Sequence, residues 1–507
     1  MKFLLGLASV LGLLSQQAWA LQPVSIKGNT FVDASGNPFV IVGVDYQPGG
    51  SSAYNPALGK DVLSDANVCL RDAYVLQQLG VNTIRIYTID PDVNHDACVS
   101  IFNAAGIYIL LDVNSALAGE SIARDNPGPT YTKSYLRRVF KVIDNFKGYP
   151  NTLGFFSGNE IVNDAASAAV SPPYIRAVQR DMKQYIANHA DRTIPVGYSA
   201  ADDTKLRRAG WEYLQCGGGD DAYEISRSDF YGLNSYEWCS GISTWATSGY
   251  SNLISTFKNS SIPLVFSEYG CNAASPRTFT EVDDGVYDKR MLGVFDGGLV
   301  YEYSNEDNGY GLVNIGADGT VEYRDDFMNL QDAYQALNYS SWFTKDSIKT
   351  AASPACSKSY IQSLAPGFNA SFALPASPAR DLIASGSGSK NVGRLVPLNG
   401  TYATTYAIYD ADGNEIDDPA ITVVSSSNSY MTSTPRSSTR TATATPTASS
   451  ATRVAASATA TSSAVVVANK TSAATAAATS DSAADAVRLG SAGSLVLAVV
   501  AAVFFAM

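Results

Sequence analysis

Two short apolar runs, T-L-G-F-F-S-G-N-E (Thr152–Glu160) and I-P-L-V-F-S-E-Y-G (Ile262–Gly270), decide the fold expected for this chain of 507 residues. Each has the length and the β-branched or aromatic content of a buried strand, and each ends on or near a glutamate, Glu160 or Glu268. In parallel α/β folds, catalytic groups collect at the C-terminal edge of the sheet. Two carboxylates there are the minimum for cleaving a glycosidic bond, one as proton donor and one as nucleophile or base. A single such glutamate would more often cap a strand or pair with an arginine, but two of them favour catalysis.

Strand-like runs alternate with longer helical patterns from Leu21 to about Trp342. Ser134–Phe146 and Tyr174–Ile186 are examples of the helical patterns. Eight strands separated by helices predict a (β/α)8 TIM barrel, with the two glutamates on the fourth and seventh strands. An open doubly wound sheet is the alternative, but no Gly-rich phosphate loop follows the first strand. The predicted strands are Phe39–Tyr46, Asn82–Tyr87, Ile107–Asp112, Leu153–Glu160, Thr193–Tyr198, Phe230–Tyr236, Pro263–Glu268 and Gly298–Tyr303.

Both ends of the chain carry targeting patterns. Met1–Ala20 has a charged start, an apolar centre and an Ala-Trp-Ala cleavage site, which predicts a secretory signal peptide. Leu489–Met507 is uncharged and apolar, and a cluster of small residues precedes it at Ser480–Ala484. That order is typical of a glycosylphosphatidylinositol (GPI) attachment signal rather than a transmembrane helix. We expect attachment near Ser482, which would hold the protein on the outer leaflet of the plasma membrane or lead it to the cell wall.

The segment between the barrel and the anchor changes in composition. Residues 425–482 are rich in Ser, Thr and Ala, which predicts a disordered, O-glycosylated stalk. Residues 343–424 are expected to form a small β-rich appendage packed on the barrel, with a hairpin at Asp412–Gly413. The D-x-D-G spelling there resembles a calcium loop, but the remaining ligand positions are missing. The expected domains are a signal peptide at 1–20, a barrel at 21–342, the appendage, the stalk, and a removed propeptide at 483–507.

Composition further limits the classes of function that we expect for this chain. The chain has six cysteines, which predict three disulfides in a secreted protein but leave 15 pairings open. It has two histidines and no C-x-x-C pair, so we expect neither a metal site, nor a cofactor, nor a Ser-His-Asp hydrolase. The net charge of −12 argues against nucleic acid as a partner and is compatible with a neutral polysaccharide. Candidate N-glycosylation sites, which chance would also produce in Ser-rich sequence, are Asn259, Asn338, Asn369, Asn399 and Asn469.

Several longer motifs, taken together, resemble the fungal β-1,3-glucanosyltransferases of glycoside hydrolase family 72. They are G-V-D-Y-Q-P-G-G, I-R-I-Y, G-N-E, S-A-A-D-D-T-K-L-R, F-Y-G-L-N-S-Y-E-W-C and V-F-S-E-Y-G-C-N. The resemblance covers about Leu21 to Tyr360 and implies an enzyme that cuts an internal β-1,3-glucan bond and joins the new reducing end to another glucan. No cysteine follows Cys356, which resembles the shorter subgroup without a Cys-rich carbohydrate-binding module.

The same resemblance implies roles for individual residues. Glu160 matches the acid/base and Glu268 the nucleophile, while Asn159 would bind the sugar 2-OH. Retention requires the two carboxyl groups to lie roughly 5–5.5 Å apart, with Glu160 protonated near neutral pH. Implied donor-site positions are Tyr87, Asn114 with the loop to Ile122, and Tyr301; acceptor-site positions are Asp202 and Arg207; Gln47, Asp112 and Tyr236 are weaker cleft candidates. For each tyrosine, a core or rim position is the alternative, because the chain contains 29 of them.

Chain position suggests how the cysteines pair. We predict Cys69–Cys98 within one β-α-β neighbourhood, Cys239–Cys271 after the sixth and seventh strands, and Cys216–Cys356 between the barrel and the appendage. Two other functions stay open at this point. One is a plain endo-β-1,3-glucanase with the same glutamates, and the other is a wall-anchored adhesin with no catalytic activity.

Overall fold

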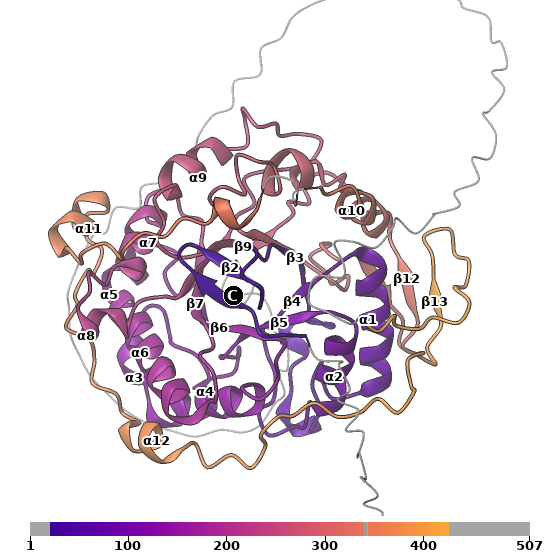
Figure 1. Ribbon diagram of the computed structural model, residues 1–507, viewed down its shortest axis with the longest axis horizontal. Helices are drawn as coiled ribbons and strands as arrows, with labels where there is room; N and C mark the ends of the chain where they lie inside the picture. The colour runs from indigo at the N-terminus through magenta and orange to yellow at the C-terminus, as the bar shows by residue number, and fades with distance from the viewer. Residues whose placement is uncertain (1–20, 339, 341–342, 425–507) are drawn as a thin grey trace, which may run out of the picture. The chain divides into compact units, whose positions relative to one another are not determined.

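Eight parallel strands close into a barrel in the computed structural model, which describes residues 21–338, 340 and 343–424. The strands follow one another around the barrel in chain order, and the last pairs with the first. The predicted TIM barrel is therefore confirmed, and Figure 1 views it along the barrel axis. The barrel strands are β3 (Ile41–Asp45), β4 (Thr83–Ile86), β5 (Tyr108–Asp112), β6 (Thr152–Asn159), β7 (Val196–Ala201), β8 (Phe230–Asn234), β9 (Leu264–Tyr269) and β10 (Gly297–Val300).

The barrel strands are buried along nearly their whole length, as parallel strands covered on both faces must be. Their register fixes which residues become neighbours at the C-terminal edge. Asp45 of β3 lies opposite Arg85 of β4, and Asn234 of β8 lies opposite Glu268 of β9. The two predicted catalytic glutamates thus come from the fourth and seventh barrel strands, as the sequence pattern indicates.

Helices surround the barrel, and their apolar faces follow the expected period. In α4, Leu136, Val139, Phe140 and Ile143 are fully buried at the i, i+3, i+4 and i+7 spacing, and Thr132 caps the first turn. The helices between or after the barrel strands are α1 (Ala66–Leu79), α2 (Asp96–Ala104), α3 (Pro127–Thr130), α4 (Lys133–Phe146), α5 (Ala165–Val170), α6 (Pro172–His189), α7 (Arg207–Gln215), α8 (Asp221–Glu224), α9 (Tyr250–Phe257) and α10 (Asp325–Gln335). Short helical turns are η1 (Ser51–Ala53), η2 (Pro56–Leu58) and the π-helical η3 (Val282–Val286).

A hairpin of β1 (Ser25–Lys27) and β2 (Thr30–Val32) lies across one end of the barrel, drawn in indigo in Figure 1. Phe31 of this hairpin is fully buried in an apolar cluster with residues that begin the barrel strands, such as Ile41 and Phe230. The buried Asp296 accepts a 2.8 Å hydrogen bond from the Phe31 N–H. The hairpin therefore closes the N-terminal end of the barrel and leaves the C-terminal end for the site.

Residues 343–424 form a belt around the outside of the helices, drawn in orange in Figure 1. Its ordered elements are η4 (Lys345–Ser347), α11 (Lys358–Leu364), α12 (Arg380–Ser385) and β13 (Ile408–Tyr409). β13 joins a small sheet with β11 (Val313–Ile315) and β12 (Val321–Tyr323), and Tyr409 bridges Glu415 across the expected turn. The belt contacts one helix after another: Pro375 O accepts from Arg180 of α6, Gly393 N donates to Asn145 O of α4, Val396 N donates to Ser100 of α2, and Thr405 N donates to Asn67 of α1.

Three disulfides hold these parts together: Cys69–Cys98 links α1 to α2, Cys239–Cys271 links the segments after β8 and β9, and Cys216–Cys356 links the belt to the end of α7. These are the pairings expected from chain position. Among the described residues, no helix has the length and apolarity that crossing a membrane requires. The expected signal peptide, stalk, Asn469 and Ser482 lie outside the described residues.

Candidate active site

The two glutamates lie at the C-terminal edge of the barrel but are held differently. Glu160 directly follows β6, where its backbone adopts a left-handed conformation with φ of 47° and its N–H donates to Ser199 O. Such a conformation is uncommon for a residue with a side chain and often marks a functional position. Glu268 lies inside β9, and its side chain is 11% exposed. Glu160 thus lies just beyond the end of its strand, where the backbone turns, whereas Glu268 lies within a strand.

Three donors bind the carboxylate of Glu268. The Tyr87 hydroxyl donates to Oε1 at 2.8 Å and the Tyr236 hydroxyl donates to Oε2 at 2.9 Å. The guanidinium of Arg85 also donates to Oε1, at 3.1 Å. An ionised carboxylate only accepts hydrogen bonds, so this arrangement suits a charged, orientated Glu268.

Arg85, which is not among the sequence-based candidates, is the fully buried centre of this network. It binds Asp112 through Nε at 3.2 Å and Nη2 at 2.9 Å, and Nη2 also donates to Asn159 Oδ1 at 3.0 Å. Its guanidinium lies 4.3 Å from the centre of the Tyr87 ring. One cation therefore connects β4, β5, β6 and β9. The signal that could have revealed it is an arginine inside the apolar run N-T-I-R-I-Y.

A network of amides and hydroxyls orientates Asn159. Its Oδ1 accepts from Arg85, from Ser199 Oγ at 2.7 Å and from Asn234 Nδ2 at 3.1 Å. Because all three contacts that the described residues make to this amide use the oxygen, the Asn159 Nδ2 is left to donate to a ligand. Asn234, also absent from the sequence-based candidates, donates its other Nδ2 hydrogen bond to Glu160 Oε1 at 2.8 Å. Ser267 Oγ supports the Asn234 amide from the other side, at 2.7 Å.

The electrostatic surroundings of the two glutamates differ. Burial, and after it the negative charge of Glu268, raise the pKa of Glu160 to about 7. The Asn234 hydrogen bond and the charges of Arg124 and Arg85 act in the opposite direction. Glu160 therefore keeps its proton up to near-neutral pH, as a general acid must, while the donors around Glu268 suit its ionised form.

Aromatic rings form a wall beside Glu268. The Tyr301 ring centre lies 6.3 Å from that of Tyr87, 6.5 Å from that of Tyr236 and 5.3 Å from that of Tyr310. All four rings are partly exposed, so they line the edge of the site and do not belong to the core. Tyr310 completes this wall and was not among the sequence-based candidates.

Asp202 and Arg207 form an ion pair beside the site. Arg207 Nη1 donates to Asp202 Oδ1 at 2.6 Å and to Glu237 Oε1 at 3.1 Å. Ser235 Oγ donates to Asp202 Oδ2 at 2.6 Å. The Asp202 and Arg207 side chains are 6% and 8% exposed, so this is not an ordinary surface pair. Glu237, one residue beyond Tyr236, also belongs to this cluster and is not among the sequence-based candidates.

The remaining candidates lie deeper in the structure. Gln47 is buried and its amide bonds the backbone of Thr88, donating at 3.3 Å and accepting at 3.0 Å. Asp112 is buried beneath the site, where it holds Arg85. Ile122 packs in the main apolar core. Asn114 follows β5, and its Oδ1 is buried with no hydrogen-bond partner among the described residues.

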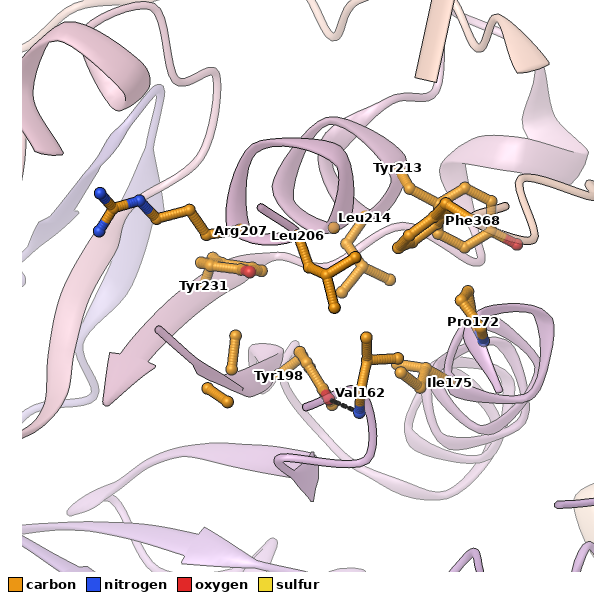
Figure 2. Close-up of a pocket in the computed structure, with 13 residues that line it drawn as sticks. Val162, Pro172, Ile175, Tyr198, Leu206, Arg207, Tyr213, Leu214, Tyr231 and Phe368 are labelled. Atoms are coloured by element: carbon orange, nitrogen blue, oxygen red, sulfur yellow. Dashed lines mark hydrogen bonds between the residues drawn. The ribbon is translucent and has the colours of Figure 1, made fainter. Parts of the chain in front are cut away.

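No group of His, Cys, Asp and Glu in the described part of the chain is arranged to hold a metal ion. A separate small cavity of about 20 Å³ lies behind Arg207, between α6, α7, β7 and β8. Figure 2 shows its apolar lining, including Leu206 and Phe368, and shows the Arg207 guanidinium pointing away from it. The cavity is lined by side chains that seat α7, and neither of the two glutamates is among them.

Comparison with known proteins adds to this geometry. Residues 14–338 match the model of a glycoside hydrolase family described as Glucanosyltransferase. The chain is 52% identical over 395 residues to the probable 1,3-beta-glucanosyltransferase GAS3 of Saccharomyces cerevisiae, covering 74% of this chain and 75% of that protein. It is 47% identical over 420 residues to the 1,3-beta-glucanosyltransferase gel2 of Aspergillus fumigatus, covering 82% and 86%. The solved structure of S. cerevisiae Gas2p in complex with laminaritriose and laminaritetraose superposes with a TM-score of 0.63 at 39% identity, covering 71% of this chain and 78% of that one.

Proposed function

This chain belongs to the glucanosyltransferases of glycoside hydrolase family 72, and we propose that it elongates β-1,3-glucan by retaining transglycosylation. The observation that carries the proposal is the pairing of a proton-holding Glu160 with a Glu268 that Tyr87, Tyr236 and Arg85 hold as a carboxylate. This is the division of roles that a double displacement needs. The donor is an internal β-1,3-glucan bond, and the acceptor is the non-reducing end of a second glucan.

In the first step, a Glu268 oxygen attacks the anomeric carbon of the donor. The glycosidic C–O bond breaks as Glu160 transfers its proton to the leaving oxygen, and an ester bond joins the sugar to Glu268. Asn159 is placed to donate from Nδ2 to the sugar 2-OH, an interaction that strengthens in the oxocarbenium-like transition state. Arg85 stabilises Glu268 as its charge is consumed and regenerated.

In the second step, an acceptor hydroxyl attacks the same carbon and loses its proton to Glu160, and Glu268 leaves as a carboxylate. If water attacks instead, the glycosyl-enzyme is hydrolysed and the donor fragment is released with a free reducing end. Asp202 and Arg207 supply charged groups that form strong hydrogen bonds to sugar hydroxyls, which would hold the acceptor in place of water. The wall of Tyr87, Tyr236, Tyr301 and Tyr310 supplies apolar area for the donor sugars.

The Gas2p complexes contain laminari-oligosaccharides, which are the substrates we expect this chain to bind. The relatives are fungal glucanosyltransferases, which is consistent with action at the cell surface. We propose further that the N-terminal signal peptide directs secretion and that a GPI lipid near Ser482 holds the protein on the outer leaflet.

The proposal is tested by incubating the purified protein with a laminari-oligosaccharide of single length, reduced at one end, and sizing the products by mass. Transfer gives products longer than the substrate, whereas an endo-glucanase gives only shorter ones. Glu268→Gln is the matched inactive variant, and we expect it to lose several orders of magnitude in rate while remaining folded. Products that are all shorter than the substrate would support hydrolysis, and no products at all would support a non-catalytic wall protein.

A further inference from the structure

Asp45 is a buried carboxyl group that the mechanism above does not use. It ends β3, its side chain is inaccessible to solvent, and neither carboxyl oxygen has a hydrogen-bond partner among the described residues. Its backbone is fixed, because Asp45 O accepts a 2.9 Å hydrogen bond from Tyr303 N and the residue lies opposite Arg85 in the strand register. An unpaired charge in such a position is costly, so the arrangement requires an explanation.

The charged groups that face Asp45 are Arg85 from β4, Asp112 from β5, Glu268 from β9 and Glu302 from the segment after β10. Arg85 is the one cation among these four, and its guanidinium is already shared by Asp112 and Glu268. Glu302 is 3% exposed and accepts a 2.7 Å hydrogen bond from Asn308 Nδ2. Four ionised carboxylates around one guanidinium would leave a large uncompensated negative charge in the barrel.

The other titratable groups near Asp45 do not supply a positive charge. They are the phenols of Tyr87, Tyr236, Tyr301 and Tyr334. Burial is the main cause that raises the pKa of each phenol, and the nearby Asp45 is a further one. Asp45 therefore lies among neutral hydroxyls and carboxyl groups, and Arg85 is its one source of opposite charge within the part of the chain that the structure describes.

We propose that Asp45 and Glu302 are positioning residues that stay uncharged in the working enzyme, and that their neutrality leaves Arg85 to Glu268 and Asp112. The inference deepens the proposed function, because it rests on the role of Glu268 as nucleophile. Asp45 lies directly opposite Arg85 in the register, so an ionised Asp45 would compete with Glu268 for the guanidinium. The protonated states are consistent with their surroundings: burial raises the pKa of Asp45 well above its ordinary value, against the effect of Arg85, and burial raises the pKa of Glu302 to about 7.

The consequence for activity is a second ionisation on the alkaline side. Above about pH 7, Glu160 loses the proton it must donate, and Glu302 also becomes charged. The new charge draws Arg85 away from Glu268, so kcat/KM falls more steeply than one ionisation allows. An amide side chain at position 45 or 302 is neutral at every pH. Each substitution therefore removes the contribution of that position to the second ionisation.

The test compares Asp45→Asn and Glu302→Gln with Asp296→Asn. Asp296 is a matched control, since it is another buried carboxyl group whose pKa burial raises well above the ordinary value, but it lies at the closed end of the barrel beside Phe31. We expect Asp45→Asn and Glu302→Gln to keep kcat/KM within about threefold of the parent near pH 5 and to decline less steeply above about pH 7. Asp296→Asn should keep the steep parental decline.

Thermal unfolding supplies a readout that does not depend on catalysis. A carboxyl group with a raised pKa in the folded state binds its proton longer there than in the unfolded chain, so stability falls as pH rises between the two pKa values. For Glu302 this interval runs from 4.5 to about 7. All three amide variants should therefore show a smaller loss of Tm between about pH 5 and pH 8 than the parent, whereas only those at 45 and 302 change the activity profile.

A hundredfold loss of kcat/KM near pH 5 in folded Asp45→Asn would show that the charged form is required and would overturn the inference. So would pH profiles of activity identical to the parent in both site variants. If Asp45→Asn does not fold, Glu302→Gln and the infrared difference spectrum between the parent and Glu302→Gln decide the question, because Glu160 also carries a proton at pH 6. A carboxylic-acid band in the difference spectrum that is present at pH 6 and absent at pH 9 supports the inference, and its absence at pH 6 contradicts it. Failure of the parent to form longer glucans would instead overturn the proposed function, while the unfolding data would still report on Asp45.

Discussion

The side-chain amide of Asn234 donates a 2.8 Å hydrogen bond to Glu160, the candidate proton donor. The same residue pairs in register with Glu268 on the neighbouring strand, and its Nδ2 also contacts Asn159. One asparagine therefore sets the acid/base relative to the strand that carries the nucleophile. Because it donates to Glu160, it stabilises the ionised form and limits how far burial raises the pKa of that group.

The pH dependence of kcat/KM should reflect the proton on Glu160. With a pKa of about 7, Glu160 loses its catalytic proton as pH rises through neutrality, so activity falls on the alkaline side. The charge of Arg124 lowers this pKa, so Arg124→Gln should move the alkaline decline to higher pH. Arg208→Gln, at an exposed position of α7, is the control and should leave the decline in place. A decline that Arg124→Gln leaves unmoved, or moves to lower pH, would disprove this assignment.

Removing the charge of the nucleophile should change the acid. In Glu268→Gln, burial still raises the pKa of Glu160 but the repulsion from Glu268 is gone. The pKa of Glu160 should therefore fall below about 7 while staying above its ordinary value of 4.5. A carbon NMR titration of glutamate-labelled protein measures it, with Glu281→Gln as a control at a buried glutamate elsewhere. An unchanged Glu160 pKa in Glu268→Gln would mean that the two carboxyl groups are not electrostatically coupled.

The Asp202–Arg207 pair should matter more for transfer than for cleavage. Asp202→Ala or Arg207→Ala leaves Glu160 and Glu268 intact but removes charged anchors for the acceptor, so water should intercept more of the glycosyl-enzyme. We expect the ratio of hydrolysis to elongation products to rise several-fold, measured by mass on a reduced laminari-oligosaccharide. Lys205→Ala removes an exposed charge two residues from Arg207 and should leave the ratio unchanged. An unchanged ratio in both site variants would indicate that the pair has a structural role and does not bind the acceptor.

The disulfides should differ in their contribution to stability. Cys216–Cys356 spans 140 residues, whereas Cys69–Cys98 spans 29. In the chain-entropy model the longer loop contributes more, about 5 kcal/mol against about 3.6 kcal/mol. Replacing each pair by serine and measuring chemical unfolding tests the order. A smaller loss of unfolding free energy for the Cys216–Cys356 variant than for the Cys69–Cys98 variant would contradict this order. It would indicate that other contacts of the belt restrain the chain without the disulfide.

The parts of the fold that repeat could be predicted from the sequence, because each strand and helix is specified by its own apolar pattern. The run ending at Glu160 and the run containing Glu268 locate both carboxylates at one edge once the strands are parallel. The belt at 343–424 could not be read in this way. Its path depends on single contacts to distant helices, such as Gly393 to Asn145, and carries no period of its own.

The candidate site likewise contains residues that the sequence pattern predicts and residues that it does not. Residues at strand ends, such as Asn159, are visible from the pattern, but Arg85 acts from inside an apolar run, where a polar residue has no periodic signal. Asn234 ends β8 as Asn159 ends β6, but its contact with Glu160 follows from tertiary packing. The resemblance also could not separate residues that face the cleft from those beneath it. Asp112 and Gln47 lie beneath it, and their bonds to Arg85 and Thr88 follow from tertiary packing alone.

The most direct measurement of the central claim uses azide with an activated aryl β-laminarioside as donor. In Glu268→Ala, azide should replace the missing carboxylate, attack the anomeric carbon directly and give the glycosyl azide of inverted, α configuration. In Glu160→Ala, the activated donor needs no proton, so the glycosyl-enzyme forms on Glu268 and azide should release the β-configured product. An α-azide from the first variant and a β-azide from the second would assign nucleophile and acid/base as proposed. The reverse pattern, or hydrolysis that persists in Glu268→Ala without azide, would contradict the account.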